Sequence, residues 1–491
     1  MESNLNKILN FIMFLVLIFL IIYTGFFTYR SITSIIYPYQ LDYGEGAILN
    51  QVNELIQGNS IYVSIDDYPF IQGNYPPVFH LFTIPGILLF GPNFFWPRFI
   101  SVLSTFLIAL FSGLIVKEIS QNNLLSVITG FLYLSIKYVF VWAPLARIDM
   151  MGVMFAVVGI YWVLKYHNSK KLFWANIFFL LAVYTRQSLF AAPISAYIWL
   201  IIQNREKGII HLKKFFISGF SLFIFLTVIT RGQFFLHLVL YNMDETSWQT
   251  VQHYLSEQLS IYLLLLLFGI MGIILLIKDK KILIPLYFLI SFMFSLTIAK
   301  VGSNVNYLVE FYAALCISAV LFLHYLFIYV KQQKKLSVKI LAVFGIVLFF
   351  FHIVTWYHIP YGQEWIETYG VKRNQGKEKE VLTLIKNTEG PVISEDMGLL
   401  ALSGKKVQFE PFEFTQLFNQ GYWDQDLLLD DIEKGKFEQI IIKFNPDNPD
   451  WRITRFNYDF LRKLKFNYVL RDKKGEYRIY EPRPSDLDID L

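Results

Sequence analysis

Long apolar runs alternate with short polar connectors along the first 360 residues. The runs lie at about 8–27, 95–116, 123–142, 150–166, 172–184, 188–203, 214–230, 258–277, 282–299, 308–330 and 338–355. A helix needs roughly 20 mostly apolar residues to cross the hydrocarbon core, where every backbone polar group must find a partner. The pattern therefore predicts about eleven transmembrane helices. The stretch Pro77–Phe90 is shorter, and we expect it to lie in the membrane interface or to re-enter the bilayer.

The pattern changes after residue 360. Strand-like stretches at Val392–Ser394, Gln439–Lys443 and Tyr477–Tyr480 alternate with helical stretches near 376–386 and 455–465. This alternation predicts a small α/β domain. The predicted fold is an α-helical polytopic membrane protein with additional interfacial helices. Its membrane domain covers 1–360 and contains a first outer loop at 28–94, and its soluble α/β domain covers 361–491.

Basic residues are unevenly distributed between the two sides of the membrane. If 77–90 does not cross, one side receives sixteen Lys and Arg residues and the other receives six. Lys and Arg gather in cytoplasmic loops, so the side with sixteen is predicted to be the cytoplasm. The outer side then carries the first loop and the whole C-terminal domain. We therefore expect the working face of the protein to be extracytoplasmic.

The composition supports this assignment and excludes several other classes of protein. Hydrophobic residues make up 55% of the chain and charged residues only 16%, against roughly a quarter in soluble domains. The net charge of +5 lies in loops between apolar runs, which gives no indication of nucleic-acid binding. The single cysteine, Cys316, excludes an internal disulfide and a thiolate zinc cluster. The sequence also lacks a glycine-rich phosphate loop of the nucleotide-binding type.

The first outer loop carries the most informative polar residues. Asp42 follows the first apolar run almost at once, so it is expected near the membrane surface. A carboxylate at that depth can meet a water-borne acceptor and a lipid headgroup, and it can serve as a general base on a hydroxyl. On the motif alone, capping of the helix that begins near Glu45 is the more common role for such an acid. The sequence leaves both interpretations open.

Two further outer segments combine acids and arginines. Asp149 begins an apolar run and follows Arg147 by two residues. In one interpretation Arg147 binds a phosphate and Asp149 binds a metal or the acceptor. In the other, Asp149 caps a helix and forms a surface ion pair with Arg147. Arg186 and Gln187 form most of a tight turn between two runs. An arginine held there needs an anionic partner, and lipid phosphate would provide one. Ordinary headgroup anchoring is the alternative.

A third outer turn, Lys300–Tyr307, is rich in hydrogen-bonding groups. Its candidate ligands for a sugar or a phosphate are Asn304, Asn306 and Tyr307. The same composition is also typical of a plain connecting loop.

These motifs together resemble those of the C-type membrane glycosyltransferases, which include the protein O-mannosyltransferases and the lipid A aminoarabinose transferases. The resemblance rests on an acid soon after the first span, a helical stretch that ends at Gly58-Asn59, and a Pro76-Pro77 pair before an interfacial helix. Pro97-Arg98, Ala146-Arg147-Ile148-Asp149 and Tyr184-Thr185-Arg186-Gln187 follow in the order expected for the family.

The resemblance implies an inverting transfer of a sugar from a polyprenyl-phosphate donor to a glycan, lipid or protein acceptor on the outer side. Carried over by position, Asp42 is the catalytic base, and Arg147 and Arg186 hold the lipid phosphate. Asp149 is a tentative ligand for a divalent metal, and Gln187 and Glu45 belong to the substrate-binding set. The main alternative is a transporter or flippase for lipid-linked glycans. An assembly protein that uses its tail to bind cell-wall polymer is a third.

Overall fold

The computed structural model describes residues 2–243, 245–333, 335–356, 363–446 and 455–484. All apolar runs predicted from the sequence form helices within these residues. The helices up to residue 356 are α1 (Glu2–Ile36), α2 (Tyr43–Ile56), α3 (Val78–Phe90), α4 (Phe95–Ser120), α5 (Asn123–Leu134), α6 (Lys137–Trp142), α7 (Asp149–Tyr166), α8 (Phe173–Thr185), α9 (Ala191–Gln203), α10 (Arg205–Ile229), α11 (Gln233–Phe235), α12 (Trp248–Lys278), α13 (Leu283–Ser295), α14 (Val309–Gln332) and α15 (Leu336–Trp356), with the short turns η1 (Lys170–Leu172), η2 (Leu236–Leu240), η3 (Leu296–Ala299) and η4 (Val305–Leu308).

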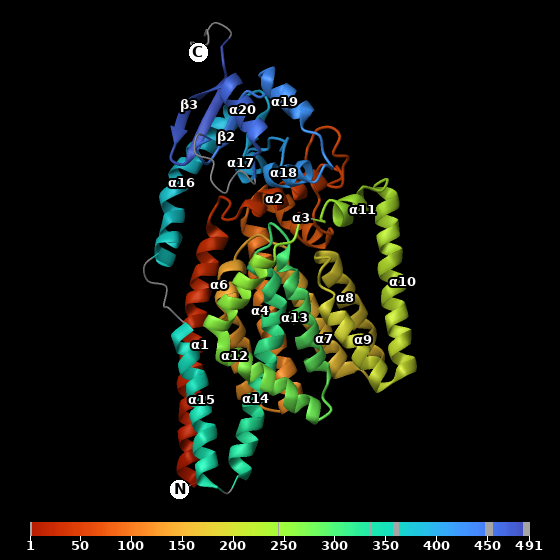
Figure 1. The fold of residues 1–491 in the computed structure, drawn as a ribbon, viewed down its shortest axis with the longest axis vertical. Coiled ribbons are helices and arrows are strands. Elements are labelled where there is room, and N and C mark those ends of the chain that lie inside the picture. The colour runs from red at the N-terminus through yellow and green to blue at the C-terminus, as the bar shows by residue number, and fades with distance from the viewer. Residues whose placement is uncertain (1, 244, 334, 357–362, 447–454, 485–491) are drawn as a thin grey trace.

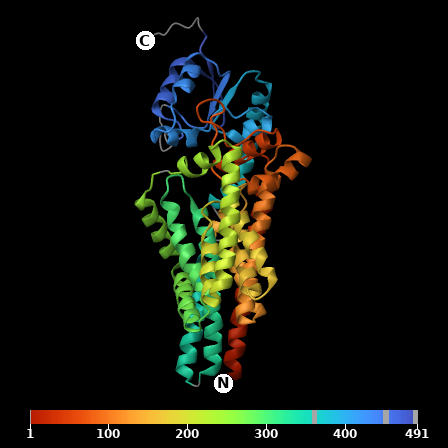
Figure 2. The same ribbon diagram turned by 90° about the vertical axis from the view of Figure 1, so that its right-hand side faces the viewer.

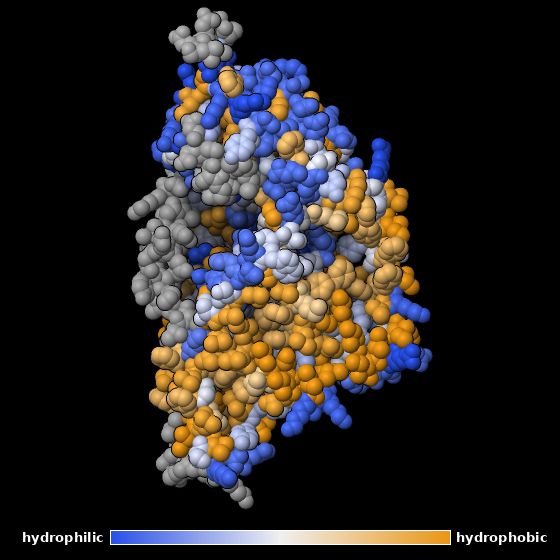
Figure 3. Space-filling model, viewed as in Figure 1, coloured by the Kyte–Doolittle hydropathy of each residue, from blue (hydrophilic) through white to orange (hydrophobic). Residues whose placement is uncertain are grey.

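These helices form a bundle with a broad apolar surface. Figure 1 shows the bundle below a separate cap, with the N-terminal end of the chain at the far end from the cap. The hydropathy colouring in Figure 3 shows a hydrophobic belt over the bundle and a mostly hydrophilic cap. Large apolar side chains such as Phe220 and Leu341 are exposed on this belt. A surface of this kind is stable in lipid rather than in water, so the chain is an integral membrane protein.

Among the described residues, six helices are long and apolar enough to cross a membrane. They lie at Phe11–Ile36, Phe95–Ser120, Asp149–Tyr166, Arg205–Ile229, Trp248–Lys278 and Val305–Val330. Shorter apolar helices lie at Val78–Phe90, Asn123–Leu134, Ala191–Gln203, Leu283–Ala299 and Ser337–Ile353. The total of eleven membrane crossings therefore stays a prediction.

The run at 123–142 differs from the single helix that its hydropathy predicts. It breaks after α5, where Ile136 takes an extended conformation before α6 begins. The backbone N–H of Lys137 then donates to the Tyr262 hydroxyl at 3.0 Å. Tyr262 is itself the one non-helical residue within α12. The break before α6 and the irregular turn of α12 therefore lie next to each other. The Tyr262 hydroxyl accepts the hydrogen bond of a backbone N–H that the break leaves without a helical partner.

The C-terminal cap is a small α/β unit, as the sequence predicts. Its elements are α16 (Gln363–Asn387), β1 (Val392–Ser394), α17 (Met397–Ser403), α18 (Pro411–Asn419), α19 (Asp426–Glu433), β2 (Gln439–Ile442), α20 (Tyr458–Asn467), β3 (Tyr468–Lys474) and β4 (Tyr477–Pro482). The sheet order is β1-β2-β4-β3, in which β1 and β2 are parallel and the other pairs are antiparallel. Ile393 pairs with Ile440, and Ile441 pairs with Ile479.

The first outer loop packs into this cap. Phe70 lies fully buried among the aromatic residues of the cap and forms a parallel β-bridge with Phe409. Helix α17 lies against α2 at a pair of glycines: a Cβ on Gly46 would approach the backbone nitrogen of Gly398 to 2.4 Å. Only residues without side chains allow this approach. Figure 2 shows the loop, drawn in red and orange, between the bundle and the blue cap. The cap is thus held in a fixed place above one end of the helix bundle.

Candidate active site

A cavity of about 320 Å³ lies where the bundle, the first outer loop and the cap meet. Its lining residues come from segments that are far apart in the sequence. They are Asp42, Tyr43, Gly44, Gln72, Asn74, Tyr75, Trp142, Arg147, Tyr241, Asn242, Lys300, Val301, Gly302, Ser303, Asn304, Asn306, Tyr307, Phe412, Glu413, Gln416 and Arg455. The volume and the polar lining suit a small hydrophilic group.

Asp42 lines this cavity and also caps helix α2. Its Oδ1 accepts a hydrogen bond from the backbone N–H of Gly44 at 3.1 Å. In return, Glu45 accepts from the backbone N–H of Asp42 at 3.3 Å, which completes a capping box. Asp42 is therefore the helix cap of α2, and its carboxylate also faces the cavity, whereas its role as a general base stays a prediction.

Arg147 is the cation nearest to Asp42. Its Nη1 lies 3.3 Å from Asp42 Oδ1, and its guanidinium carbon lies 5.6 Å from the centre of the Trp142 ring. Within the described residues, the buried Nε of Arg147 has no hydrogen-bond partner. A planar guanidinium that lines a cavity with one donor unused is well suited to bind a further anion.

Desolvation and a neighbouring cation act on the pKa of Asp42 in opposite directions. Desolvation raises the pKa of the carboxyl above its ordinary value of 3.8, and the Coulomb attraction of Arg147 lowers it. A raised pKa makes the carboxylate a stronger base and brings its pKa closer to that of the hydroxyl that it would deprotonate.

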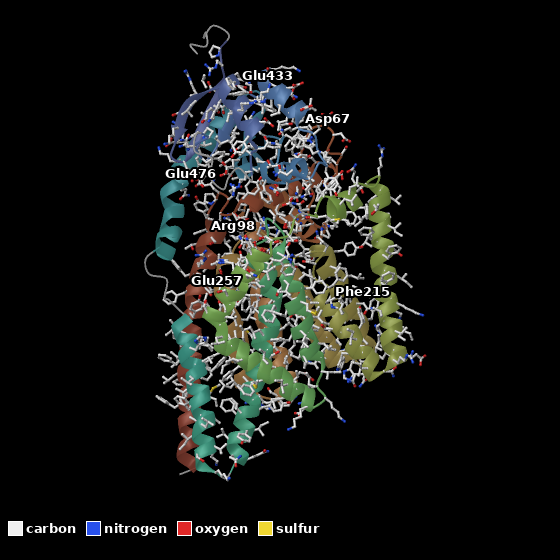
Figure 4. All side chains as sticks on the ribbon, viewed as in Figure 1. Asp67, Arg98, Phe215, Glu257, Glu433 and Glu476 are labelled. Atoms are coloured by element: carbon white, nitrogen blue, oxygen red, sulfur yellow. The ribbon has the colours of Figure 1, made fainter. Side chains whose placement is uncertain are left out.

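Glu45 lies outside the cavity, which corrects the expectation that it contacts the substrate. Its carboxylate forms a bidentate ion pair with Arg98, with Nε–Oε1 at 2.8 Å and Nη2–Oε2 at 2.7 Å, and neither side chain is exposed. Oε1 also accepts from the backbone N–H of Ala146 at 2.6 Å. Arg98, labelled in Figure 4, lies at the junction of bundle and cap. Because every oxygen of Glu45 is engaged, its role is to hold the segments of Asp42 and Arg147 together.

Asp149 and Arg186 form a second buried pair below the cavity. Arg186 Nη1 lies 2.8 Å from Asp149 Oδ1, and both side chains are almost completely buried. The other oxygen of Asp149 accepts from the Trp142 indole N–H at 2.7 Å. Neither residue lines the cavity, so direct contact of Arg186 with a ligand would require this pair to open. Asn306 and Tyr307, which the pair holds, do line it.

The contacts that fix Asn306 and Tyr307 are specific. The side-chain amide N–H of Asn306 donates to Asp149 at 2.9 Å, and the backbone carbonyl of Asn306 accepts from Arg186 at 3.1 Å. The Arg186 guanidinium carbon lies 4.2 Å from the centre of the Tyr307 ring. Asn304, which also lines the cavity, caps η4 through a bond from the Val305 N–H at 2.7 Å. The polar turn predicted at 300–307 therefore belongs to the cavity wall.

Gln187 does not line the cavity. Its amide donates to the backbone carbonyl of Asn74 at 2.9 Å, and the amide of Asn242 donates to the same carbonyl at 3.0 Å. Gln187 therefore positions a loop whose residues Asn74 and Tyr75 form part of the wall.

The residues present do not fit the tentative metal role of Asp149. Both of its carboxylate oxygens are occupied by cationic or N–H donors. In the described parts of the chain, no group of three or more His, Cys, Asp or Glu side chains is arranged to hold a metal ion. A divalent cation prefers several oxygen ligands that are free to coordinate.

Four wall residues come from the cap, and none of them was predicted from the sequence. Phe412, Glu413 and Gln416 lie on α18, and Arg455 precedes α20. Burial raises the pKa of the Glu413 carboxyl, although Arg147 and the hydrogen bond from Tyr43 lower it in part. The only signal in the sequence is the polar face of a short helix, which looks the same whether it faces water or a cavity.

Comparisons of the whole chain support a shared fold. No protein-family model matches the chain, and no curated protein matches it. Among solved structures, apo ArnT from Cupriavidus metallidurans matches with 12% identity and a TM-score of 0.58, over 94% of this chain and 97% of ArnT. The same protein bound to undecaprenyl phosphate matches with 11% identity and a TM-score of 0.59, over 95% and 98%.

A second neighbour is the archaeal oligosaccharyltransferase AglB from Archaeoglobus fulgidus, in complex with an inhibitory peptide and a dolichol-phosphate. It matches with 11% identity and a TM-score of 0.54, over 95% of this chain and 75% of AglB. At these identities the likeness concerns the fold. The chain therefore shares the fold of ArnT and of AglB.

Proposed function

We propose that the chain is a membrane glycosyltransferase that moves a sugar from a polyprenyl-phosphate-linked donor to an acceptor on the outer side of the membrane. The observation that carries the proposal is the pairing of Asp42 with Arg147 at 3.3 Å in the wall of a polar cavity. A base and a phosphate-binding cation are the two groups that this transfer needs. Structural neighbours that bind undecaprenyl phosphate and dolichol-phosphate add support for the donor class.

Asp42 is the proposed base. Its carboxylate removes the proton of an acceptor hydroxyl while the hydroxyl oxygen forms a bond to the anomeric carbon of the donor sugar. The bond from that carbon to the phosphate oxygen breaks at the same time, and the polyprenyl phosphate leaves from the opposite face. A single displacement of this kind inverts the configuration at the anomeric carbon.

Arg147 is the proposed partner of the leaving phosphate, because it faces the cavity and has an unused donor. Since the base and the leaving phosphate lie on opposite sides of the anomeric carbon, the 3.3 Å contact between Arg147 and Asp42 has to open when the donor binds. Arg186 supports the same site from below through Asn306 and Tyr307. Lys300 adds a second cation to the wall, and its ammonium donates to Asn242 at 2.9 Å. The positive charges would stabilise the negative charge that develops as the phosphate departs.

The outward orientation of this site belongs to the same proposal. Lysine-rich connectors are expected in the cytoplasm, so the cap and the cavity face outward. Nucleotide sugars are confined to the cytoplasm, and a lipid-linked donor would supply the sugar at an outer face. The domain division at residue 360 and the eleven crossings are parts of this topology.

A transfer assay in membranes tests the proposal. Membranes that contain the full chain are incubated with a panel of radiolabelled polyprenyl-phosphate sugars, and label is followed from the organic-extractable lipid to other products. We expect label to leave the lipid for one donor at least. Label that stays on the lipid but becomes accessible on the opposite face would instead identify a flippase and overturn the enzyme assignment.

A further inference from the structure

We propose that the side of the cavity formed by the cap is the acceptor site, and that the acceptor group it binds is an uncharged sugar. This inference rests on the proposed function and specifies its second substrate. We call this side the roof and define it by Tyr43, Phe412, Glu413, Gln416 and Arg455.

Helix α18 presents one face to the cavity and the other to the core of the cap. Phe414 and Leu417 are buried in the aromatic core of the cap. Phe412, Glu413 and Gln416 lie on the opposite face, since residues three and four positions apart share a side of a helix. The polar face of α18 therefore points into the cavity.

The roof is fixed to the loop that carries Asp42. The backbone N–H of Glu410 donates to the carbonyl of Phe70 at 2.9 Å, and Glu410 accepts from the backbone N–H of Gln72 at 2.8 Å. The backbone N–H of Phe412 donates to the Tyr43 hydroxyl at 3.0 Å, and that hydroxyl donates to Glu413 at 3.3 Å. These bonds hold the roof at a fixed distance from Tyr43 and therefore from the adjacent Asp42. A fixed distance between the bound acceptor and the base favours proton removal.

The charges of the roof argue against a phosphorylated acceptor. Its one cation, Arg455, already lies 2.5 Å from the buried carboxylate of Glu395. An acceptor phosphate would also lie near two carboxyl groups of the cavity wall, Asp42 and Glu413. An anion at the roof would therefore meet carboxyl groups and no cation other than the paired Arg455, since the other cations of the cavity, Arg147 and Lys300, are the proposed partners of the donor phosphate.

The chemistry of the roof suits a sugar. Tyr43 and Phe412 form an edge-to-face pair with ring centres 6.5 Å apart, which offers an apolar surface to the C–H face of a pyranose. The amide of Gln416 and the carboxyl of Glu413 supply planar groups that both donate and accept when the acid is protonated, and burial favours that form. A helix face offers no free backbone groups to pair with an extended peptide, as a sheet edge would.

Photolabelling tests this assignment independently of transfer. The full chain in phospholipid nanodiscs is labelled with a diazirine-bearing neutral disaccharide, and the modified peptides are identified by mass spectrometry. We expect labelling within 411–419 that a tenfold excess of unmodified disaccharide removes. Gln416→Ala should reduce the labelling about tenfold, which corresponds to the loss of one good hydrogen bond.

Asn419→Ala is the matched control, because it removes an amide from an exposed position of the same helix outside the cavity. It should leave the labelling unchanged. Labelling of 411–419 by a diazirine-bearing Ser/Thr peptide or phosphorylated glycolipid, but not by the disaccharide, would overturn the proposal. So would equal effects of the two substitutions. Disaccharide labelling without any sugar transfer would support the roof as a sugar site and contradict the proposed glycosyltransferase activity. Sugar transfer without labelling would support the activity and contradict the assignment of the roof.

Discussion

The guanidinium of Arg147 reaches Asp42 through the space that the missing side chain of Gly44 leaves open. A Cβ built on Gly44 would lie 1.2 Å from Arg147 Nη1, whereas the observed distance from that nitrogen to Asp42 Oδ1 is 3.3 Å. Gly44 does not take a positive φ, so its backbone does not require glycine. The glycine is needed because a cation must pass close to the first turn of α2.

Gly44→Ala should therefore reduce transfer strongly with little effect on folding. The new methyl group displaces Arg147 from Asp42, and we expect activity to fall at least tenfold. The free energy of unfolding should change by less than about 1 kcal/mol, because alanine favours the helix by roughly that amount and offsets the local rearrangement. Transfer activity and thermal unfolding in detergent measure the two effects. Gly376→Ala, on α16 with no atom within 4 Å of the new Cβ, is the matched control and should retain full activity.

Asp42→Asn separates the two roles of Asp42. Asparagine caps a helix about as well as aspartate, so the variant should fold and insert normally. It cannot accept a proton, and the rate of transfer should fall by about 10² to 10⁴. Expression level in membranes and initial rates measure this difference. Transfer at the wild-type rate would show that Asp42 is only a cap.

Much of the fold could be predicted from the sequence because lipid imposes simple rules. Apolar runs marked every long helix of the membrane bundle, and alternating patterns marked β1, β2 and β4. Strand β3 was missed because it is an edge strand whose residues Arg471, Asp472, Lys473 and Lys474 face solvent and show no apolar alternation. The break between α5 and α6 was also missed, because it depends on the hydroxyl of Tyr262, 125 residues away.

The candidate site was only partly predictable, because its cavity joins residues that are far apart in the sequence. Asp42, Arg147 and the 304–307 turn were identified because each stands beside an apolar run at the predicted outer surface. Glu413 was missed because its place in the cavity depends on contacts such as that with Tyr43, 370 residues earlier in the chain. Local patterns identify which residues lie near the membrane surface, but only tertiary packing decides which of them face a shared cavity.

The buried pair Glu45–Arg98 should be the most stability-sensitive point of the site. Glu45→Gln leaves the charge of Arg98 buried without its counter-ion, which costs about 3–5 kcal/mol. Thermal unfolding in detergent measures the loss. Glu433→Gln removes an acid from an exposed ion pair with Lys463 and should lower the unfolding temperature far less than Glu45→Gln does. Equal losses for the two variants would contradict the structural role of Glu45.

The same pair gives stability a defined dependence on pH. Burial acts to raise the pKa of Glu45, but Arg98 and the backbone donors outweigh it and lower the pKa below its ordinary value of 4.5. A depressed folded-state pKa contributes stability above the unfolded-state pKa, and that contribution disappears as pH falls through the folded-state value. Unfolding of the wild type should therefore become easier below about pH 4.5, and Glu45→Gln should weaken this dependence.

The pH dependence of transfer should report the interaction between Asp42 and Arg147. Asp42 must be ionised to act as a base, so the rate should rise with pH through the pKa of Asp42, which burial places above 3.8. Arg147 lowers that pKa, so Arg147→Gln should move the acid limb of the profile to higher pH, in addition to any loss of rate.

Lys300→Gln is the control for this shift. It removes another cation from the same cavity, but one that is not among the main charges acting on Asp42. Initial rates of transfer across the pH range in which each variant stays folded measure the midpoints. Arg147→Gln should move the midpoint clearly more than Lys300→Gln does. Equal midpoints in wild type and Arg147→Gln would mean that the group whose ionisation limits transfer is not in contact with Arg147, and that the base lies elsewhere in the cavity.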